Sequence, residues 1–202
     1  MFALKHAKKK SKERIFYVAP YTSIIEQNAS AIRKAINCGD NLLEYHSNIV
    51  SDAKEDANIL SDRWNSKLVF TTLVQFLNTL FAPPSGNLRR MISLANSIII
   101  FDEIQNIPIH CISLFNSAIN FLNKCFNCTI ILCTATQPVL DITKRSIQLS
   151  EDSEIVKDVD DAYNKLKRVD IIDKTKKEGY TYEEVANFLL KVKHNKLSAL
   201  LV

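Results

Sequence analysis

The sequence NSIIIFDEIQNIP, residues 96–108, joins a run of pure hydrocarbon to two adjacent acids and then turns away at a proline. Isoleucine-rich runs without polar alternation are typical of a parallel strand that is covered on both faces. Asp102 and Glu103 therefore fall at the carboxyl end of a predicted strand. In open α/β sheets, ligands bind at that end of the strands. The stretch thus predicts a parallel sheet with a polar site at one rim.

Length, composition and charge are ordinary for a globular protein. The 202 residues suffice for one good-sized core, or for one domain plus the start of another. Hydrophobic residues make up 47% and charged residues 24%, and the net charge of +4 is too small to indicate a nucleic-acid partner by itself. No apolar run approaches the ~18 residues of a membrane span and no signal peptide precedes the first strand, so we expect a cytoplasmic protein without a membrane partner.

The cysteines favour packing roles. They are odd in number, at five, and several lie in apolar segments, which suits reduced core thiols better than a disulfide framework. Cys125 and Cys128 form a C-x-x-C pair, but no second Cys or His pair follows at zinc-finger spacing, so we expect no metal site there. His46 and Trp64 are likewise expected to be packing residues rather than ligands.

Strands and helices alternate along the chain. The predicted strands are 14–20, 67–72, 96–101, 128–136, 168–173 and 197–202. Capping-box patterns predict helix starts at Ser23/Glu26, Thr72/Gln75 and Thr181/Glu184, and Pro108 suits the first turn of another helix. Residues 82–87 have the composition of a loop. Such regular alternation implies a parallel sheet with right-handed crossovers.

Polar residues follow four of the predicted strands, in the segments VAPYTSII, TTLVQF, FDEIQ and CTATQP. In a parallel sheet these ends share one rim, where adjacent acids suit nucleotide hydrolysis: one carboxylate holds Mg²⁺, usually through water, and its neighbour activates the attacking water. Asp102 would hold the metal and Glu103 the water. Alone, the pair is more simply a helix-entry charge pair. A Mg²⁺ phosphohydrolase on a doubly wound sheet also places acids at strand ends, but it would not explain CTATQP or PYTSII.

Five segments in order, PYTSIIEQNA, LLEYHSN, TTLVQFLNTLF, NSIIIFDEIQNIP and ILCTATQP, resemble the motifs of superfamily 2 helicases of the DEAD/DEAH type. Within that group the chain is similar to the helicase part of the CRISPR-associated helicase-nucleases of type I systems. The resemblance spans nearly the whole chain and implies an α/β fold with a RecA-like parallel sheet and helices on both faces. Residues 1–163 would be an incomplete first motor domain, and residues 164–202 the start of a second RecA-like domain.

The same resemblance implies ATP and Mg²⁺ as cofactors, and single-stranded DNA and a Cascade-type CRISPR surveillance complex as partners. The catalytic residues would be Asp102, which binds Mg²⁺ through water, and Glu103. Coupling of hydrolysis to strand movement would fall to Gln105, Thr134 and Thr136, and contacts to the DNA backbone to Thr22, Ser23, Thr71 and Thr72. Hydroxyls and free N–H groups at helix starts are good phosphate ligands, although the same residues can serve as plain helix caps.

One expected motif is absent from these 202 residues. A phosphate-cradling loop reads G-x-x-x-x-G-K-[ST], and none of the three glycines, Gly39, Gly86 and Gly179, is followed by Lys-Ser or Lys-Thr. By resemblance, residues 1–10 look like the back half of the helix that follows this loop, and the arginine finger of a second domain is missing too. We therefore expect no ATP turnover by this chain alone. Two functions stay open: part of an ATP-dependent DNA helicase of CRISPR type I interference that unwinds target DNA for degradation, or an inactive remnant that at most binds nucleic acid.

Overall fold

The computed structural model describes residues 2–36, 41–46, 64–82, 85–134, 140, 145–150, 153–168 and 173–192. The chain divides into two compact units, residues 1–150 and residues 151–202. None of the described helices combines the length and the apolar composition that crossing a membrane requires. The strand predicted at 197–202, and the middle of the one at 168–173, lie outside the described residues.

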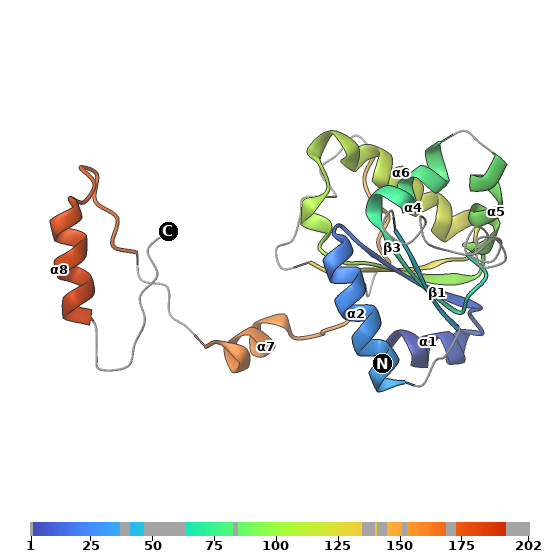
Figure 1. Cartoon of the computed structure of the whole chain (residues 1–202), viewed down its shortest axis with the longest axis horizontal. Coiled ribbons are helices and arrows are strands. Elements are labelled where there is room, and N and C mark those ends of the chain that lie inside the picture. Colours follow the sequence, from blue (N-terminus) through green and yellow to red (C-terminus); the bar gives the residue numbers. More distant parts are fainter. Residues whose placement is uncertain are drawn as a thin grey trace. The chain divides into compact units, whose positions relative to one another are not determined.

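The first unit is built on a five-stranded sheet, in which every pairing is parallel and the order is β2-β3-β1-β4-β5 (Figure 1). The strands are β1 (Arg14–Ala19), β2 (Leu42–Tyr45), β3 (Leu68–Thr72), β4 (Ser97–Phe101) and β5 (Thr129–Leu132). The predicted parallel α/β sheet is confirmed. The sequence pattern missed β2, because it has only four residues and one of them is Glu44, whose carboxylate accepts a hydrogen bond from Arg33.

Helices cover both faces of this sheet, as predicted (Figure 1). On one face lie α1 (Phe2–Lys10) and α2 (Thr22–Ala35), and on the other α4 (Leu73–Phe81), α5 (Ser85–Ser93) and α6 (Ile112–Cys125). Two 3-10 turns, η2 (Ile104–Asn106) and η3 (Ile109–Cys111), connect β4 to α6. The loop predicted at 82–87 is wrong from residue 85 onward, because small polar residues that suit loops also begin helices. In the second unit lie α7 (Val159–Leu166) and α8 (Tyr182–Val192).

Two of the predicted helix starts have the expected caps. The Thr72 hydroxyl accepts a hydrogen bond from the Gln75 N–H at 3.3 Å and so begins α4. At α8, the Glu184 N–H donates to the Thr181 hydroxyl at 3.2 Å, and the Thr181 N–H donates to the Glu184 carboxylate at 3.0 Å. That reciprocal pair is a capping box, in which each side chain satisfies a backbone donor left over at the helix end.

The capping prediction for Ser23 is wrong. The helix α2 begins at Thr22, and its N-cap is the extended residue Tyr21, which makes no side-chain cap hydrogen bond. Ser23 therefore lies inside the first turn and is exposed. Because its hydroxyl is not needed to cap the helix, Ser23 can be changed without removing a cap.

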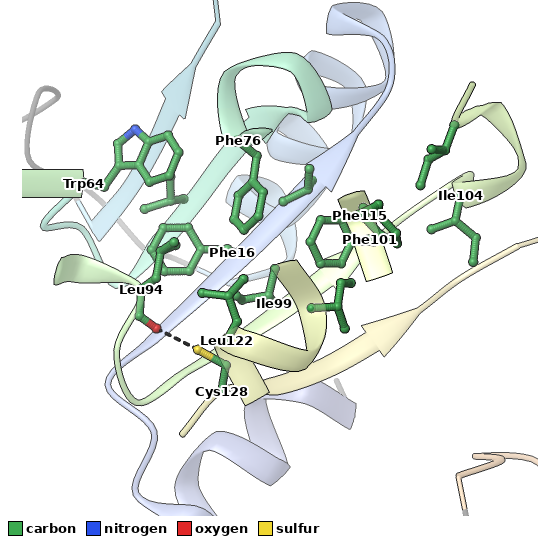
Figure 2. Packing of buried hydrophobic residues seen from close by; sticks show 14 of the residues in the cluster. Phe16, Trp64, Phe76, Leu94, Ile99, Phe101, Ile104, Phe115, Leu122 and Cys128 are labelled. Atoms are coloured by element: carbon green, nitrogen blue, oxygen red, sulfur yellow. Dashed lines mark hydrogen bonds between the residues drawn. The ribbon is translucent and has the colours of Figure 1, made fainter. Parts of the chain in front are cut away.

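A ladder of aromatic rings forms the core beneath α4 and α6 (Figure 2). Trp64 stacks on Phe76 at a centroid distance of 6.3 Å, and Phe101 meets Phe76 and Phe115 edge to face at 5.1 Å each. Aromatic pairs in these geometries add to the free energy gained by burying the rings. Trp64 is thus a packing residue, as predicted. Cys128 also lies in this core, where its thiol donates to the Leu94 carbonyl at 3.0 Å (Figure 2).

The strand β5 is the less protected end of the sheet. Among the described strands it pairs only with β4, and all four of its residues are partly exposed. The strand β1, by contrast, pairs with β3 on one side and β4 on the other. An unpaired edge leaves a row of backbone N–H and C=O groups open.

Native-state hydrogen exchange is expected to reflect this difference. We expect amides of β1 to exchange on the order of 100-fold more slowly than those of β5, because β1 opens only when most of the sheet unfolds. The measurement is amide exchange read by NMR or by mass spectrometry of peptides. Equal protection in both strands would contradict the prediction and would show that the free edge of β5 is covered in solution.

Candidate functional site

The acidic pair lies at the carboxyl rim of the sheet, directly after β4. The Asp102 N–H donates to the Val18 carbonyl at 2.8 Å, which extends the pairing with β1 by one residue. On the other side, the Cys133 N–H donates to the Phe101 carbonyl at 2.8 Å. Both acids are half-buried. Their backbone is therefore fixed by the two neighbouring strands, while their side chains reach solvent.

A left-handed residue turns the chain at this point. Glu103 has φ 54° and ψ 42°, a conformation that costs a residue with a side chain about 1–2 kcal/mol. The turn begins η2 and brings the Glu103 carboxylate to the Gln105 side-chain amide, which donates to it. The Thr134 hydroxyl then donates to the Gln105 side-chain oxygen at 2.7 Å. Glu103, Gln105 and Thr134 thus form one network that joins the ends of β4 and β5.

Asp102 has a separate set of partners. One carboxylate oxygen accepts a hydrogen bond from the Tyr17 hydroxyl, and the other accepts from the Glu103 N–H at 3.0 Å. The Tyr17 oxygen in turn accepts from the side-chain amide of Asn28 at 2.6 Å. Within the described residues, neither Asp102 nor Glu103 forms an ion pair with a lysine, arginine or histidine. No cation among the described residues therefore neutralises the negative charge of the pair.

The donor set suits Mg²⁺, which binds carboxylate oxygens, keeps several waters and takes further ligands from a nucleotide's phosphates. Over the described ranges no cluster of three or more His, Cys, Asp or Glu side chains could enclose an ion. A metal at Asp102 would therefore depend on water and phosphate for most of its ligands. That arrangement fits a nucleotide-bound ion and not a structural one.

The charge of Asp102 also acts on neighbouring groups. Burial raises the pKa of the Tyr17 phenol, and the hydrogen bond to Asp102 and the charge of that carboxylate raise it further. Burial likewise raises the pKa of the Cys133 thiol, with a smaller contribution from Asp102. Both groups therefore stay protonated at neutral pH, and Tyr17 remains a hydrogen-bond donor.

Alkylation of the cysteines tests this electrostatic picture. Iodoacetamide at pH 8 is expected to modify exposed Cys125 faster than half-buried Cys133, because the thiolate is the reacting form and the raised pKa of Cys133 lowers its thiolate fraction. Asp102→Asn is expected to speed reaction at Cys133 but not at buried Cys128. Rates come from mass spectrometry of the labelled peptides. A Cys133 as reactive as Cys125 would contradict the assignment.

The four hydroxyl residues predicted to contact DNA lie at the ends of two neighbouring strands, β1 and β3. Ser23 is exposed and Thr22 half-buried, both in the first turn of α2. Thr72 is nearly buried and caps α4. Thr71 is fully buried, and its hydroxyl has no hydrogen-bond partner in the part of the chain that is described. Of the four, Ser23 is the most exposed to solvent.

Three further residues bear on the site: Thr136, which was predicted, and Tyr17 and Asn28, which were not. Thr136 lies outside the described residues. The Tyr17 hydroxyl donates to Asp102, and the Asn28 amide donates to Tyr17. Tyr17 stands inside an apolar strand and Asn28 inside a helix. Tyr17 meets Asp102 because β1 lies beside β4, and it meets Asn28 because α2 packs against β1.

Comparisons with known proteins agree with this geometry. Residues 1–144 match the DEAD/DEAH box helicase family. The CRISPR-associated nuclease/helicase Cas3 of Haloferax volcanii is 29% identical over 146 residues, which cover 62% of this chain and 16% of that protein. The chain thus spans a small part of that relative's length. The parallel sheet with an acidic pair at its carboxyl rim is consistent with the RecA-like fold of the matched family. Because that match extends over well more than half of its residues, the chain belongs to the DEAD/DEAH box helicases.

Proposed function

We propose that this chain is part of an ATP-dependent DNA helicase, and that the helicase unwinds target DNA for degradation in CRISPR type I interference. The observation that carries the proposal is the network at the carboxyl rim. An acidic pair without a cationic partner in the described residues is linked through Gln105 to Thr134 at the end of the next strand. The resemblance to a CRISPR-associated nuclease/helicase supports the narrower part of the proposal.

The roles of the acids follow from their surroundings. Asp102 would hold Mg²⁺ through water, because both of its oxygens are fixed by hydrogen bonds and it has no cation beside it among the described residues. Bound Mg²⁺ would neutralise charge on the nucleotide's phosphates. Glu103 would orient the attacking water, since its carboxylate is held by the Gln105 side-chain amide and has no hydrogen bond to Tyr17 or Asn28, the side chains that hold Asp102. One acid thus binds the metal and the other the water.

Gln105 and Thr134 would couple the site to the rest of the motor. The Thr134 hydroxyl donates to the Gln105 oxygen, so the Gln105 amide nitrogen is free to donate to Glu103. A movement of the Glu103 side chain during hydrolysis would therefore shift Gln105 and, through it, Thr134 at the end of β5. We include Thr136 in this role by the same motif.

Single-stranded DNA would lie over the ends of β1 and β3, near Thr22, Ser23, Thr71 and Thr72. The first turn of α2 contains no acidic residue, so its free N–H groups and positive dipole end are open to a phosphate. Neutral hydroxyls bind phosphate without the strong charge attraction that would slow release of a moving strand. The partner that delivers DNA would be a Cascade-type surveillance complex, and residues 164–202 would begin the second motor domain after a first that ends at 163.

The alternative is a chain that binds nucleic acid without catalysis. It is favoured by one feature, the absence of G-K-[ST] from these 202 residues. A polypeptide limited to these 202 residues supplies no G-K-[ST] lysine to the γ phosphate, and a cationic group at that phosphate can be worth on the order of 10³ in rate. We therefore expect no measurable ATP turnover by the purified chain, and robust Mg²⁺-dependent hydrolysis would contradict this expectation.

Binding of a fluorescent ATP analogue, with and without Mg²⁺, separates the two functions. If the chain is part of a motor, the analogue binds more tightly when Mg²⁺ is present, and Asp102→Asn removes that dependence. The matched control is Asp160→Asn, which removes the same charge from an exposed position on α7 and is expected to have no effect. Binding that is indifferent to Mg²⁺ in the unmodified chain would contradict the metal role of Asp102 and favour the non-catalytic alternative.

A further inference from the structure

We infer that Tyr17 is a positioning residue for the Asp102 carboxylate and that Asn28 sets the direction of its hydrogen bond; the inference rests on the proposed Mg²⁺ site. Tyr17 would touch neither metal nor nucleotide. It would act through Asp102, by holding the carboxylate in the orientation that a metal ion requires. In other proteins, mutating a group that holds a metal ligand in this way typically lowers metal affinity or activity by 10- to 100-fold.

The register of the sheet brings the two residues together. Tyr17 on β1 lies beside Ile100 on β4, and Asp102 is two residues further along. Side chains two positions apart on a strand share a face, so Tyr17 and Asp102 are on the same side of the sheet. The phenol extends up that face to the carboxylate, and its ring packs on Phe70 at a centroid distance of 5.0 Å. Packing therefore holds the ring while its hydroxyl reaches the acid.

The two hydrogen bonds that link Asn28, Tyr17 and Asp102 can run in only one direction. The Asn28 side-chain nitrogen lies 2.6 Å from the Tyr17 oxygen, and an amide nitrogen only donates. The phenol oxygen is therefore the acceptor, and its single hydrogen points to Asp102, whose carboxylate only accepts. Asn28 thus prevents the phenol from turning its hydrogen elsewhere.

Together these contacts fix the plane of the carboxylate. Tyr17 binds one oxygen of Asp102 and the Glu103 N–H binds the other at 3.0 Å. Each carboxylate oxygen has a further lone pair, so a metal ion or its water can still bind. Without the phenol, one oxygen would have no partner among these contacts and the carboxylate could rotate. Metal binding would then have to fix the orientation of the carboxylate, and the affinity for the metal would be lower.

The test is a Mn²⁺ titration of the whole ¹⁵N-labelled chain, read from paramagnetic broadening of the Glu103 and Gln105 backbone amides. Tyr17→Phe keeps the ring on Phe70 and removes only the hydroxyl. We expect it to weaken Mn²⁺ binding about tenfold or more, and Asn28→Leu to weaken it less. The control Tyr163→Phe alters an exposed tyrosine of α7 and is expected to bind Mn²⁺ as the unmodified chain does. Thermal melting is followed in parallel, because a purely structural tyrosine would change the melt and not the affinity.

Asp102→Asn separates failure of this inference from failure of the proposed function. If Asp102→Asn abolishes the broadening and Tyr17→Phe weakens it, the inference is supported. If Asp102→Asn abolishes it and Tyr17→Phe matches the unmodified chain, Tyr17 is not a positioning residue and the metal site stands. If Asp102→Asn leaves the broadening unchanged, there is no metal at this carboxylate, and both the site and the role of Tyr17 are overturned.

Discussion

Phe101→Ala is expected to lower the free energy of unfolding by about 3–5 kcal/mol. Phe101 is 1% exposed and is the last residue of β4, directly before the acidic pair. Its ring meets Phe76 of α4 and Phe115 of α6 edge to face at 5.1 Å each (Figure 2). Removing it leaves a cavity between the strand and the two helices, which the remaining rings of Phe76 and Phe115 cannot fill because each is fixed on its own helix.

The matched control is Phe121→Ala, on the same helix as Phe115. Phe121 is 41% exposed and contacts Phe126 at 5.2 Å, so its loss should cost about 1 kcal/mol or less. Urea denaturation followed by circular dichroism measures both variants. Equal losses in the two would show that the core is not centred on the aromatic ladder.

Ser23→Asp is expected to weaken binding of single-stranded DNA by about 10- to 100-fold at low salt while stabilising the fold slightly. A carboxylate placed against a phosphate costs roughly 1–4 kcal/mol, depending on how well water screens it. The same carboxylate in the first turn of α2, which has no acidic residue, should stabilise the helix by about 0.3–1 kcal/mol. The two effects have opposite signs, so weaker binding cannot be ascribed to unfolding.

Ser30→Asp provides the control on the same helix. Ser30 is exposed in the middle of α2, away from its N-terminus, and carries the same change of charge. Fluorescence anisotropy of a labelled oligothymidine should show a large loss for Ser23→Asp and little for Ser30→Asp. Similar losses in both variants would indicate a general charge effect, and no loss in either would remove Ser23 from the DNA site.

Local sequence pattern predicted the elements that have a strong local signal. The strands β1, β3, β4 and β5 are apolar runs, and each was predicted. The strand β2 was missed because four residues with one acid give no such pattern. The helix α7 was missed because it lies among acidic residues and, within the described part of its unit, buries no side chain.

Helix caps also show that local sequence pattern predicts structure only in part. Thr72 and Ser23 carry the same pattern, a hydroxyl residue with Gln or Glu three positions on. Thr72 caps α4, but α2 starts two residues earlier than its pattern suggests, because Tyr21 is already the last extended residue before the helix. The pattern places a helix start to within a turn, and the residue that caps it depends on where the preceding strand ends.

Some residues of the candidate site could also be predicted from local sequence pattern, and others could not. Asp102, Glu103, Gln105 and Thr134 follow strands directly, so their meeting at one rim follows from the parallel sheet. The partnership of Tyr17 with Asp102 depends on β1 lying next to β4, and strand order is not written in any local pattern. Likewise, the left-handed turn at Glu103 comes from the tertiary structure, because glutamate has no local preference for it.

Crystals of the chain soaked with Mn²⁺ and a non-hydrolysable ATP analogue would locate the metal by its anomalous scattering. If Asp102 and Glu103 form the nucleotide–metal site, the manganese peak lies beside their carboxylates at the carboxyl rim of β4, and crystals of the Asp102→Asn variant lack it. A peak at other carboxylates, with none at this rim, would contradict the metal site and the ATP-dependent motor built on it.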